Sequence, residues 1–451
     1  MSTFNPKTVE EFRFLDWQFD EKTYTASLRY AFDNDYIFTE KFIFPTPTFA
    51  LTDEKRGALE MCLQNLHLAA GISYYKAAIP SKISIENYVI SPETARFFNK
   101  LYLYGLGEFA YKNKVDLQGH ISFPYVNEPF PSASKIELGH RTAIPVGGGK
   151  DSIVTIEMLK KLSIPLLLIS IGNASPIAKT AEIAQLPHVA IKRELSPLLL
   201  ELNEKGALNG HVPISAIISF AISVAAVLYD FNYIVMSNER SANIGNLWHD
   251  GLEINHQYSK SLEFEKDISR YLHNHVLDNL RYFSFLRPLS ELMISKVFCD
   301  NCQPYHDIFA SCSMAFRLTK SLEGRWCLNC AKCRFVFAMM APFMPKEKLV
   351  QIFGKNLLDD SEQISGFREI MGLGKHKPFS CIGESEETIA AFVILSSNNE
   401  WKDNVVVAHF TEEILPTLTL PETYVENALL FSENHLLEKN EKDLLLENMN
   451  I

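Results

Sequence analysis

Two hydrophobic patterns divide the chain. Within the first fifty positions, aromatic and β-branched residues recur at every second position, in YTASLRYAF (24–32) and YIFTEKFIFP (36–45). A two-residue period is typical of β-strands. Helix-like sequences follow at 54–78 and 92–113. We therefore predict an α+β N-terminal domain over residues 1–138.

Short apolar runs alternate with helical stretches from about Arg141 onward. The runs are TAIPV (142–146), PLLLISIGN (165–173), HVAIKREL (188–195) and YIVMSNE (233–239). This alternation is typical of an α/β fold with a doubly wound parallel sheet and helices on both faces. We assign residues 139–345 to this domain and residues 346–451, where the pattern weakens, to a mostly helical C-terminal region.

The most apolar segment lies at 211–231. Polar residues interrupt it and Asp230 closes it, which favours a buried helix over a membrane span. Serines at 215, 219 and 223 recur every fourth position and so line one face of this helix.

Composition and net charge limit the classes of partner that we expect. The chain has 451 residues, of which 47% are hydrophobic, and a net charge of −11. Phosphate binding usually leaves a basic footprint, so nucleic acid is a disfavoured partner. The first residues lack the basic and apolar regions of a secretory signal. We expect a cytoplasmic protein with no nucleic-acid or membrane partner.

A glycine-rich turn follows the first apolar run of the α/β region, in AIPVGGGKDSIVTIEMLKKL (143–162). A strand, such a turn and a helix direct backbone N–H groups and the helix dipole at one anion. The Walker motif does not fit, because it needs glycine where Ile144 stands and Ser or Thr where Asp151 stands. The dinucleotide motif needs glycine or alanine in place of Ser152. A turn without a ligand would not require three glycines, which forfeit backbone entropy.

The turn instead resembles the PP-loop of ATP pyrophosphatases. Gly147, Gly148, Gly149, Lys150, Asp151 and Ser152 match that signature, with Gly147 in place of its first serine. The resemblance implies an adenine nucleotide alpha hydrolase-like fold that cleaves ATP to AMP and pyrophosphate while it adenylates a substrate. It also implies that Gly148, Gly149 and Ser152 hold the pyrophosphate, that Asp151 helps to hold Mg²⁺, and that Lys150 and Asp151 are catalytic. Asn173, at the end of the second apolar run, is assigned to the same nucleotide site.

Cysteines form a second cluster. Six of the eight lie between 299 and 333, and WCLNCAKCRF contains C-x-x-C-x-x-C. In a cytosolic chain this spacing favours a metal site over disulfides, with reduced buried thiols or redox chemistry as alternatives. The segment resembles the zinc site of cyano-deazaguanine synthase, which implies Cys312, Cys327, Cys330 and Cys333 as ligands of a structural Zn²⁺. Cys299 and Cys302 compete for these roles, and Cys62 and Cys381 lie outside the cluster.

A polar stretch at 234–267 follows the fourth apolar run. Loops at the carboxyl ends of parallel strands form the ligand crevice, so this stretch is either a substrate wall or a solvated surface loop. The predicted substrate residues are Ser237, Asn238, Glu239, Arg240, Asn255, Gln257, Tyr258 and Ser259. His256 and Lys260 are predicted to be catalytic, and His249, Asp250 and Tyr258 are alternative bases.

The order of these motifs resembles the MurL family. The matching segments are GGGKDS, GHVPISAI, SNERSA, NHQYSKS, WCLNCAKCRFVF and KPFSCIGE, across about 140–390. The resemblance implies an isomerase of peptidoglycan precursor synthesis, and so a role in cell-wall biogenesis, cell shape and division. Its reaction would invert the terminal L-Glu of UDP-MurNAc-L-Ala-L-Glu, a UDP-linked muropeptide, at the expense of ATP.

Two other classes compete with this interpretation. One is a PP-loop ligase or nucleobase-modifying enzyme related to cyano-deazaguanine synthase, and the other is a non-catalytic nucleotide-binding regulator. The N-terminal extension of roughly 140 residues and the acidic charge disfavour the first. The second would not need Asp151 within a full glycine turn.

Overall fold

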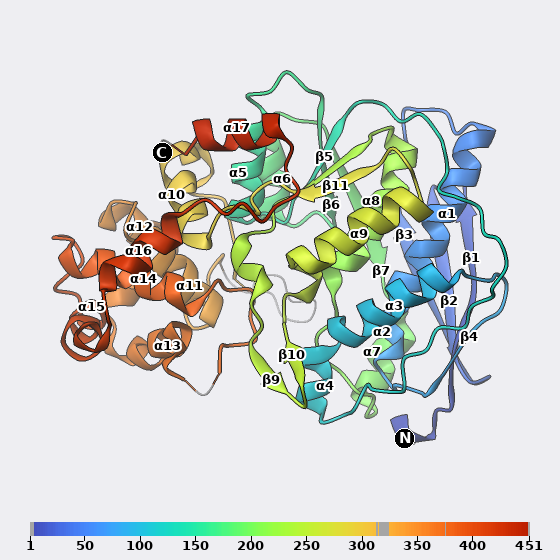
Figure 1. Ribbon diagram of the computed structural model, residues 1–451, viewed down its shortest axis with the longest axis horizontal. Coiled ribbons are helices and arrows are strands. Elements are labelled where there is room, and N and C mark those ends of the chain that lie inside the picture. The colour runs from blue at the N-terminus through green and yellow to red at the C-terminus, as the bar shows by residue number, and fades with distance from the viewer. Residues whose placement is uncertain (1–3, 313, 315–323, 375, 450–451) are drawn as a thin grey trace.

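The structure is a computed structural model that describes residues 4–312, 314, 324–374 and 376–449. Within these residues, nine strands form one sheet in the order β11-β8-β5-β6-β7-β3-β2-β1-β4 (Figure 1). Their bounds are β1 (Glu11–Asp20), β2 (Thr25–Phe32), β3 (Tyr36–Ile43), β4 (Lys82–Ile85), β5 (Thr142–Pro145), β6 (Leu166–Ile171), β7 (His188–Glu194), β8 (Tyr233–Met236) and β11 (Arg281–Ser284). A separate hairpin consists of β9 (Leu247–His249) and β10 (Leu252–Ile254).

The four apolar runs predicted as strands form β5, β6, β7 and β8, so this prediction is confirmed. Together with β11 they pair in parallel throughout. The chain proceeds outward from β5 to β6 and β7, returns to the other side of β5 as β8, and then adds β11. This reversal of direction beside β5 is the switch point at which open α/β sheets form their ligand crevice. The predicted α/β class with a mostly parallel sheet is thus confirmed.

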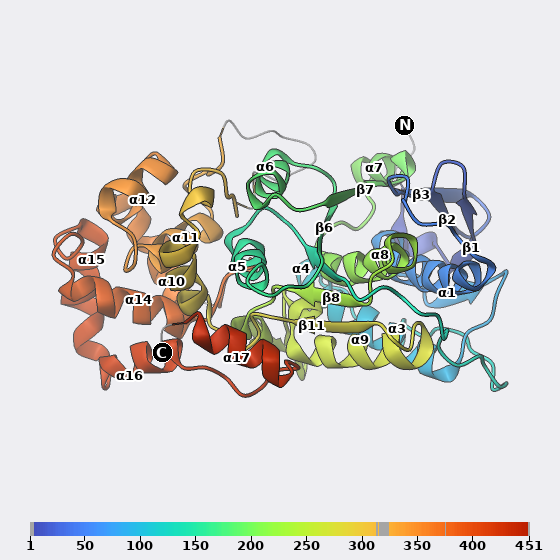
Figure 2. The same ribbon diagram turned by 90° about the horizontal axis from the view of Figure 1, so that it is seen from above.

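Alternate residues of the parallel strands enter two different hydrophobic cores. Ala143 and Leu167 belong to one core, while their neighbours Ile144 and Leu168 belong to the other. Because side chains alternate across a strand, the two cores lie on opposite faces of the sheet. The first core includes α8 (Ile214–Tyr229) and α9 (Leu262–His275), and the second includes α5 (Lys150–Leu159), α6 (Ser175–Ala184) and α10 (Glu291–Asn301). Figure 2 shows α6 and α9 on opposite sides of the strands.

Helix α8 is the predicted buried helix, and nearly all of its residues are inaccessible to solvent. Two of its three serines find partners within the helix: Ser219 donates to the carbonyl of Ser215 at 2.8 Å, and Ser223 to that of Phe220 at 2.7 Å. Local satisfaction of these hydroxyls allows them to lie in an apolar core. Across the described residues, none of the helices combines the length and apolar character that crossing a bilayer requires.

The N-terminal strands extend the parallel sheet. The predicted strands at 24–32 and 36–45 form β2 and β3, and β3 pairs antiparallel with β7. The sheet therefore continues across residue 138, and β1 and β4, which were not predicted, complete its edge. Helices of this part are α1 (Asp53–Ala70), α2 (Ile72–Tyr75), α3 (Pro92–Gly105) and α4 (Gly107–Asn113), and α7 (Pro197–Glu204) follows β7.

Helices occupy the other end of the molecule (Figure 1). They are α11 (Ala331–Met340), α12 (Lys346–Phe353), α13 (Ile364–Arg368), α14 (Ser385–Ser397), α15 (Val405–His409) and α16 (Pro421–Leu429). The last helix, α17 (Lys439–Glu447), returns to the sheet, where Arg281 of β11 donates to Glu441 at 2.8 Å. The C-terminal segment thus packs against the parallel strands.

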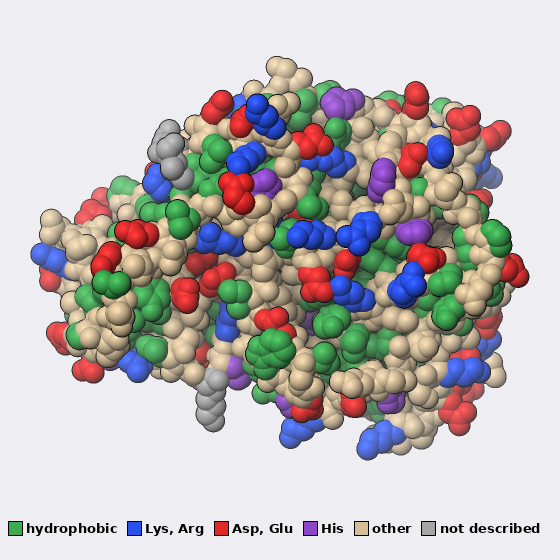
Figure 3. All heavy atoms as spheres, in the orientation of Figure 1, with side chains coloured by type: hydrophobic (Ala, Val, Ile, Leu, Met, Phe, Trp, Pro, Cys, Tyr) green, Lys and Arg blue, Asp and Glu red, His purple; other side chains and the backbone are tan. Residues whose placement is uncertain are grey.

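Charges are mixed on the surface. On the face seen in Figure 3, Lys and Arg side chains are interspersed with Asp and Glu side chains. The visible face therefore lacks one broad area of a single sign, in a chain whose net charge is −11.

A buried ion pair fastens the antiparallel strands to the parallel ones. Arg193 Nε of β7 lies 2.5 Å from Glu40 Oε1 of β3, and the side chains are 12% and 0% exposed. Loss of one partner leaves an unpaired buried charge, so we expect Arg193→Met to lower the free energy of unfolding by about 3–5 kcal/mol. Equilibrium urea unfolding measures this change.

Arg56→Met is the matched control. Arg56 pairs with Glu21 at 2.9 Å, but both side chains are more than 40% exposed. Its loss should cost about 0–1 kcal/mol. Equal losses in the two variants would contradict a special role of the β3–β7 pair.

Candidate active site

The GGGKDS turn lies between β5 and α5 and is held from two sides. Gly148 has a φ of +78°, and a Cβ there would lie 2.8 Å from Cβ of Pro176, at the start of α6. Its carbonyl accepts a hydrogen bond from the amide of Ala310 at 2.9 Å. At Gly149, a Cβ would lie 3.1 Å from Ser311 Oγ. Only glycine fits the left-handed, closely approached backbone of position 148 without strain.

A cavity of about 400 Å³ opens at this turn. It is lined by Pro145, Val146, Gly147, Gly149, Asp151, Ser152, Ile169, Ser170, Ile171, Ile177, Ser215, Ile218, Ile222, Met236, Ser237, Asn238, Lys260, Ala310, Ser311, Lys332 and Cys381. Its volume is in the range typical of small-ligand sites. The turn, Asp151 and two lysines contribute polar groups, and isoleucines from the strands and α8 contribute apolar ones.

The N-terminus of α5 faces this cavity with free amides. Its N-cap residue is Gly149, and no side chain in the described part of the chain caps it. Helices α1, α3, α9 and α10 each have a Ser or Thr hydroxyl at this position, whereas α6, α7 and α8 have no side-chain cap either. An uncapped helix N-terminus retains unsatisfied N–H groups and a positive dipole end, so it can bind an anion.

The cavity brings together part of the predicted nucleotide and substrate residues. Those that line it are Gly147, Gly149, Asp151, Ser152, Ser237, Asn238 and Lys260. Asn173 is exposed beyond the end of β6 and is not among the lining residues. The structure therefore places the turn and the end of β8 around one cavity, and Asn173 outside it.

Lys150 points into the protein. Its side chain is 1% exposed, and its ammonium group contacts Asp151 and the carboxylate of Glu291. Lys332, which sequence reasoning did not single out, contacts the other oxygen of Glu291 at 3.3 Å. Burial alone would raise the pKa of Glu291, but Lys150 and Lys332 outweigh it and lower this pKa to about 2. Nearby, burial raises the pKa of Glu239, and the adjacent Glu291 raises it further.

The remaining predicted substrate residues fix the position of their loop through contacts with neighbouring segments. Arg240 donates to the carbonyls of Leu430 and Asn427, and Asn255 donates to that of Ala242. Gln257 donates to the carbonyl of Ile382, Tyr258 stacks on Tyr104, and Ser259 is buried. Polar residues in this stretch thus hold the chain near the cavity, and most of them do not line it.

The predicted base His256 connects the cavity wall to a buried carboxylate. Its Nε2 lies 3.5 Å from Sγ of Cys381, and its Nδ1 contacts the carboxylate of Glu108 in α4. His211 lies beside it, with ring centroids 4.3 Å apart. Sequence reasoning missed Glu108 and His211, because only the fold brings them to His256.

Two alternative bases lie elsewhere. His249 and Asp250 line a separate cavity of about 900 Å³ between α4 and the β9–β10 hairpin. Their side chains are 50% and 84% exposed. The structure therefore separates them from the GGGKDS cavity, whereas Lys260 lines it.

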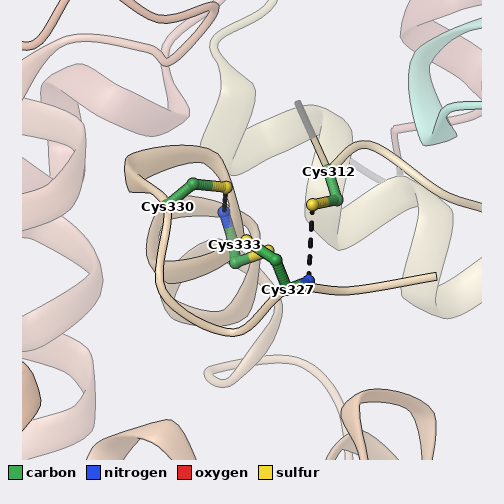
Figure 4. A group of neighbouring side chains, drawn as sticks. All are labelled: Cys312, Cys327, Cys330 and Cys333. Carbon is green, nitrogen blue, oxygen red and sulfur yellow. Dashed lines mark hydrogen bonds between the residues drawn. The ribbon is translucent and has the colours of Figure 1, made fainter. Parts of the chain in front are cut away.

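Four cysteines come together beyond the turn. The sulfur atoms of Cys312, Cys327, Cys330 and Cys333 all lie within 4.8 Å of one another. Figure 4 shows Cys327, Cys330 and Cys333 around the start of α11, with Cys312 facing them from a separate segment. Thiolates around a tetrahedral Zn²⁺ lie about 3.8 Å apart, and the sulfurs of Cys327 and Cys333 are separated by 3.9 Å. This donor set can hold a metal ion.

Cys299 and Cys302 do not belong to that group. Both are buried, and burial raises the pKa of Cys302 to about 12. The structure thus gathers the other four cysteines and leaves these two outside the group.

The cavity lies at the switch point of a parallel sheet. The GGGKDS turn, the buried charges around Glu291 and the contact between His256 and Cys381 lie at or beside it. This arrangement is typical of α/β enzymes. The MurL N-terminal domain model matches residues 3–285, and the MurL C-terminal domain model matches residues 308–423. The chain belongs to the MurL family.

Curated relatives span nearly the whole chain. A protein of Xanthomonas oryzae pv. oryzae is 41% identical over 436 residues, 96% of either chain, and one of Salinispora tropica is 38% identical over 424 residues, 91% of this chain and 90% of its own. Both are named UDP-N-acetyl-alpha-D-muramoyl-L-alanyl-L-glutamate epimerase. The resemblance drawn from the motifs is thereby confirmed.

Gly148 and Gly147 form a matched pair for a test of the turn. We expect Gly148→Ala to lower the free energy of unfolding by at least about 1–2 kcal/mol, the cost of a left-handed backbone for a residue with a Cβ. A Cβ at Gly147 meets nothing within 4 Å, so Gly147→Ala should stay within about 0.5 kcal/mol of the unmodified protein. Urea unfolding compares the two, and equal losses would contradict the strained turn.

Proposed function

We propose that this protein epimerises the terminal L-Glu of UDP-MurNAc-L-Ala-L-Glu to D-Glu, in a reaction that consumes ATP and adenylates the α-carboxylate. One observation carries the proposal: a single cavity joins the uncapped N-terminus of α5 to Asp151, Lys260 and an apolar wall. The names of the relatives supply the substrate class. On this proposal the parallel part of the sheet is of the PP-loop type.

The two ends of the cavity suit the two ends of ATP. Backbone N–H groups of the turn around Gly149 and Ser152 are positioned to bind the departing pyrophosphate. Ile218 and Ile222 of α8 and Met236 of β8 provide an apolar surface for the adenine ring. The open space at Gly147 means that the missing serine of the signature leaves room for a phosphate or a water molecule.

Asp151 is the residue that would help to hold Mg²⁺. It lines the cavity, and carboxylate oxygens are the ligands that Mg²⁺ prefers. When bound, Mg²⁺ neutralises charge that develops on the pyrophosphate. Lys150 contacts Asp151 from the protein interior, so its role is to position this carboxylate rather than to contact phosphate.

Adenylation makes the epimerisation chemically accessible. Removal of the α-proton beside an ionised carboxylate would add negative charge to a group that already has one. The acyl adenylate has no such charge, and its carbonyl group accepts the electron pair of the broken C–H bond. Return of a proton to the opposite face inverts the carbon, and hydrolysis of the adenylate then releases the D-Glu product.

Ser237, Asn238 and Lys260 are the groups of the predicted substrate wall that reach the cavity. Lys260 can attract the anionic terminal glutamate, although the chain as a whole is acidic.

Asp151→Asn tests the nucleotide step. The substitution preserves shape but removes the charge, so we expect a folded protein with AMP formation reduced at least about 100-fold. AMP and D-Glu are quantified after incubation with ATP, Mg²⁺ and UDP-MurNAc-L-Ala-L-Glu.

Asp250→Asn provides the control, since Asp250 is an exposed aspartate outside the GGGKDS cavity. It should form AMP at the unmodified rate. Full AMP formation by Asp151→Asn would refute the role of the turn, and release of AMP without D-Glu would favour a ligase.

We also propose that the four cysteines bind a structural Zn²⁺. Four thiolates complete a tetrahedral site and leave no position for catalysis. Cys330→Ser should therefore lose about one zinc per chain by elemental analysis and unfold at a lower temperature. Cys302→Ser, a buried cysteine outside the group, should retain the metal, and unmodified protein without zinc would overturn this assignment.

A further inference from the structure

Cys381 closes a chain of three side chains that ends in the cavity wall. Its thiol lies 3.5 Å from Nε2 of His256, and Nδ1 of the same ring contacts the carboxylate of Glu108. Cys381 and Lys260 both line the cavity that contains the GGGKDS turn. A thiol, an imidazole and a carboxylate in series have the arrangement that activates thiols in enzymes.

The charges around the thiol favour its ionised form. Burial alone would raise the pKa of Cys381, but Lys260 and the hydrogen bond to His256 outweigh it and lower this pKa to about 6. Burial would lower the pKa of His256, but Cys381 and Glu108 raise it to about 9. At neutral pH the two side chains therefore form a thiolate–imidazolium pair.

Two other buried thiols, Cys62 and Cys302, lack this environment. Burial raises the pKa of Cys62 to about 12, and that of Cys302 likewise to about 12. The difference lies in the neighbouring cations, because Lys260, His256 and Lys332 all act on Cys381. A thiolate at the wall of a ligand cavity can accept a proton from a bound molecule.

We propose that Cys381 is the base that removes the α-proton of the substrate glutamate, with His256 and Glu108 as positioning residues and Lys260 as the acid that returns a proton. The inference rests on the proposed function, because only an adenylated carboxylate makes this proton acidic enough.

The steps balance without another reactant. The Cα–H bond breaks, its electron pair moves into the adjacent carbonyl group, and the proton forms an S–H bond on Cys381. The ammonium group of Lys260 then gives a proton to the opposite face of the same carbon, where the new Cα–H bond forms. Transfer of the thiol proton to the neutral amine of Lys260 restores the thiolate and the ammonium ion.

Glu108, His211 and His256 also lie close enough together to share a metal ion. Glu108 already contacts Lys112 and His256, and these contacts satisfy its charge without a metal. A metal ion bound by Glu108, His211 and His256 is therefore the alternative that the His256→Gln variant must distinguish.

Isotope exchange in D₂O separates the two chemical steps. Cys381→Ser should retain ATP–pyrophosphate exchange in the presence of substrate within a few-fold, because adenylation does not need the thiol. It should lose deuterium incorporation at the α-carbon, and D-Glu formation, by at least about 100-fold, the usual contribution of a general base. Cys62→Ala, which removes a buried thiol that does not line the cavity, should behave as the unmodified protein.

Lys260→Gln tests the returning acid. If Lys260 protonates the opposite face, this variant should incorporate deuterium into glutamate that keeps the L configuration, with D-Glu formation lost. Continued inversion would overturn the role of Lys260, and loss of ATP–pyrophosphate exchange would assign it to adenylation instead.

Two results would overturn the role of Cys381. One is deuterium incorporation by Cys381→Ser at the unmodified rate, and the other is loss of its ATP–pyrophosphate exchange. Failure of the unmodified protein to exchange pyrophosphate would instead refute the proposed function.

Thiol titration tests the positioning residues without turnover. Iodoacetamide alkylation of the Cys381 peptide, followed by mass spectrometry from pH 4 to 10, reports the thiolate fraction. The groups that face Cys381 are Lys260, His256 and Lys332, and Glu108, His211, Asp151 and Glu239 lie beyond them. A pKa near 6 means that alkylation and deuterium incorporation both fall as pH drops through 6.

His256→Gln removes a proton donor to the thiolate, so the midpoint of alkylation should move to higher pH by at least one unit. His249→Gln, an exposed histidine in the other cavity, should leave the midpoint unchanged. An unchanged midpoint in His256→Gln would refute the pair. If the unmodified protein binds a second metal ion per chain and His256→Gln loses it, then Glu108, His211 and His256 form a metal site instead of supporting the thiolate–imidazolium pair.

Discussion

The buried carboxylate of Glu291 joins the GGGKDS turn to the start of α11. It begins α10 at 2% exposure and contacts Lys150 of α5 and Lys332 of α11. An isolated charge at such depth would cost several kcal/mol, so both lysines are bound to remain with it. Lys150 contacts Asp151, and Lys332 lies in sequence between Cys330 and Cys333 of the cysteine group. This link connects the cysteine cluster to the GGGKDS turn: a metal ion there would fix the first turn of α11 and thereby the place of Lys332 in the cavity wall.

The sheet provides the second constraint. Its central parallel strands β5, β6 and β8 bury side chains on both faces, so polar groups collect in the segments that follow their carboxyl ends. Asp151, Ser237 and Asn238 all follow such ends. The N-terminal strands do not add groups to this cavity, but they place α3 and α4 beside α8 and the loop after β10. Glu108 reaches His256 by this route, from 148 positions away in sequence.

The sequence predicts those features that depend on local pattern. Strands β5, β6, β7 and β8 were recognised because short apolar runs alternate with helical stretches, and α8 because polar residues interrupt a long apolar segment that Asp230 closes. The four residues of β11 form a strand only through pairing with β8, and the β3–β7 pairing joins segments 153 positions apart. Polarity alone nominated Arg240, Asn255 and Gln257, whose hydrogen bonds go to backbone carbonyls. Glu108, His256 and Cys381 share no spacing that a pattern could detect, because three separate segments supply them.

The two chemical steps proposed for the cavity place different requirements on its charges, because one binds an anionic ligand and the other uses an anionic base. Adenylation brings a polyanion to the amides of α5, where Asp151 needs a cation to relieve its own charge. Proton removal needs a thiolate that stays ionised, which requires that it be kept away from the negative charge of the phosphates. Lys260 and Lys332 serve both steps, because both line the cavity that contains the turn and Cys381 and their charge can stabilise either anion. A base with a pKa near 6 is weak against an ordinary carbon acid, so it is effective only after the carboxylate has lost its charge. The order of the two steps is thus imposed by the strength of the base.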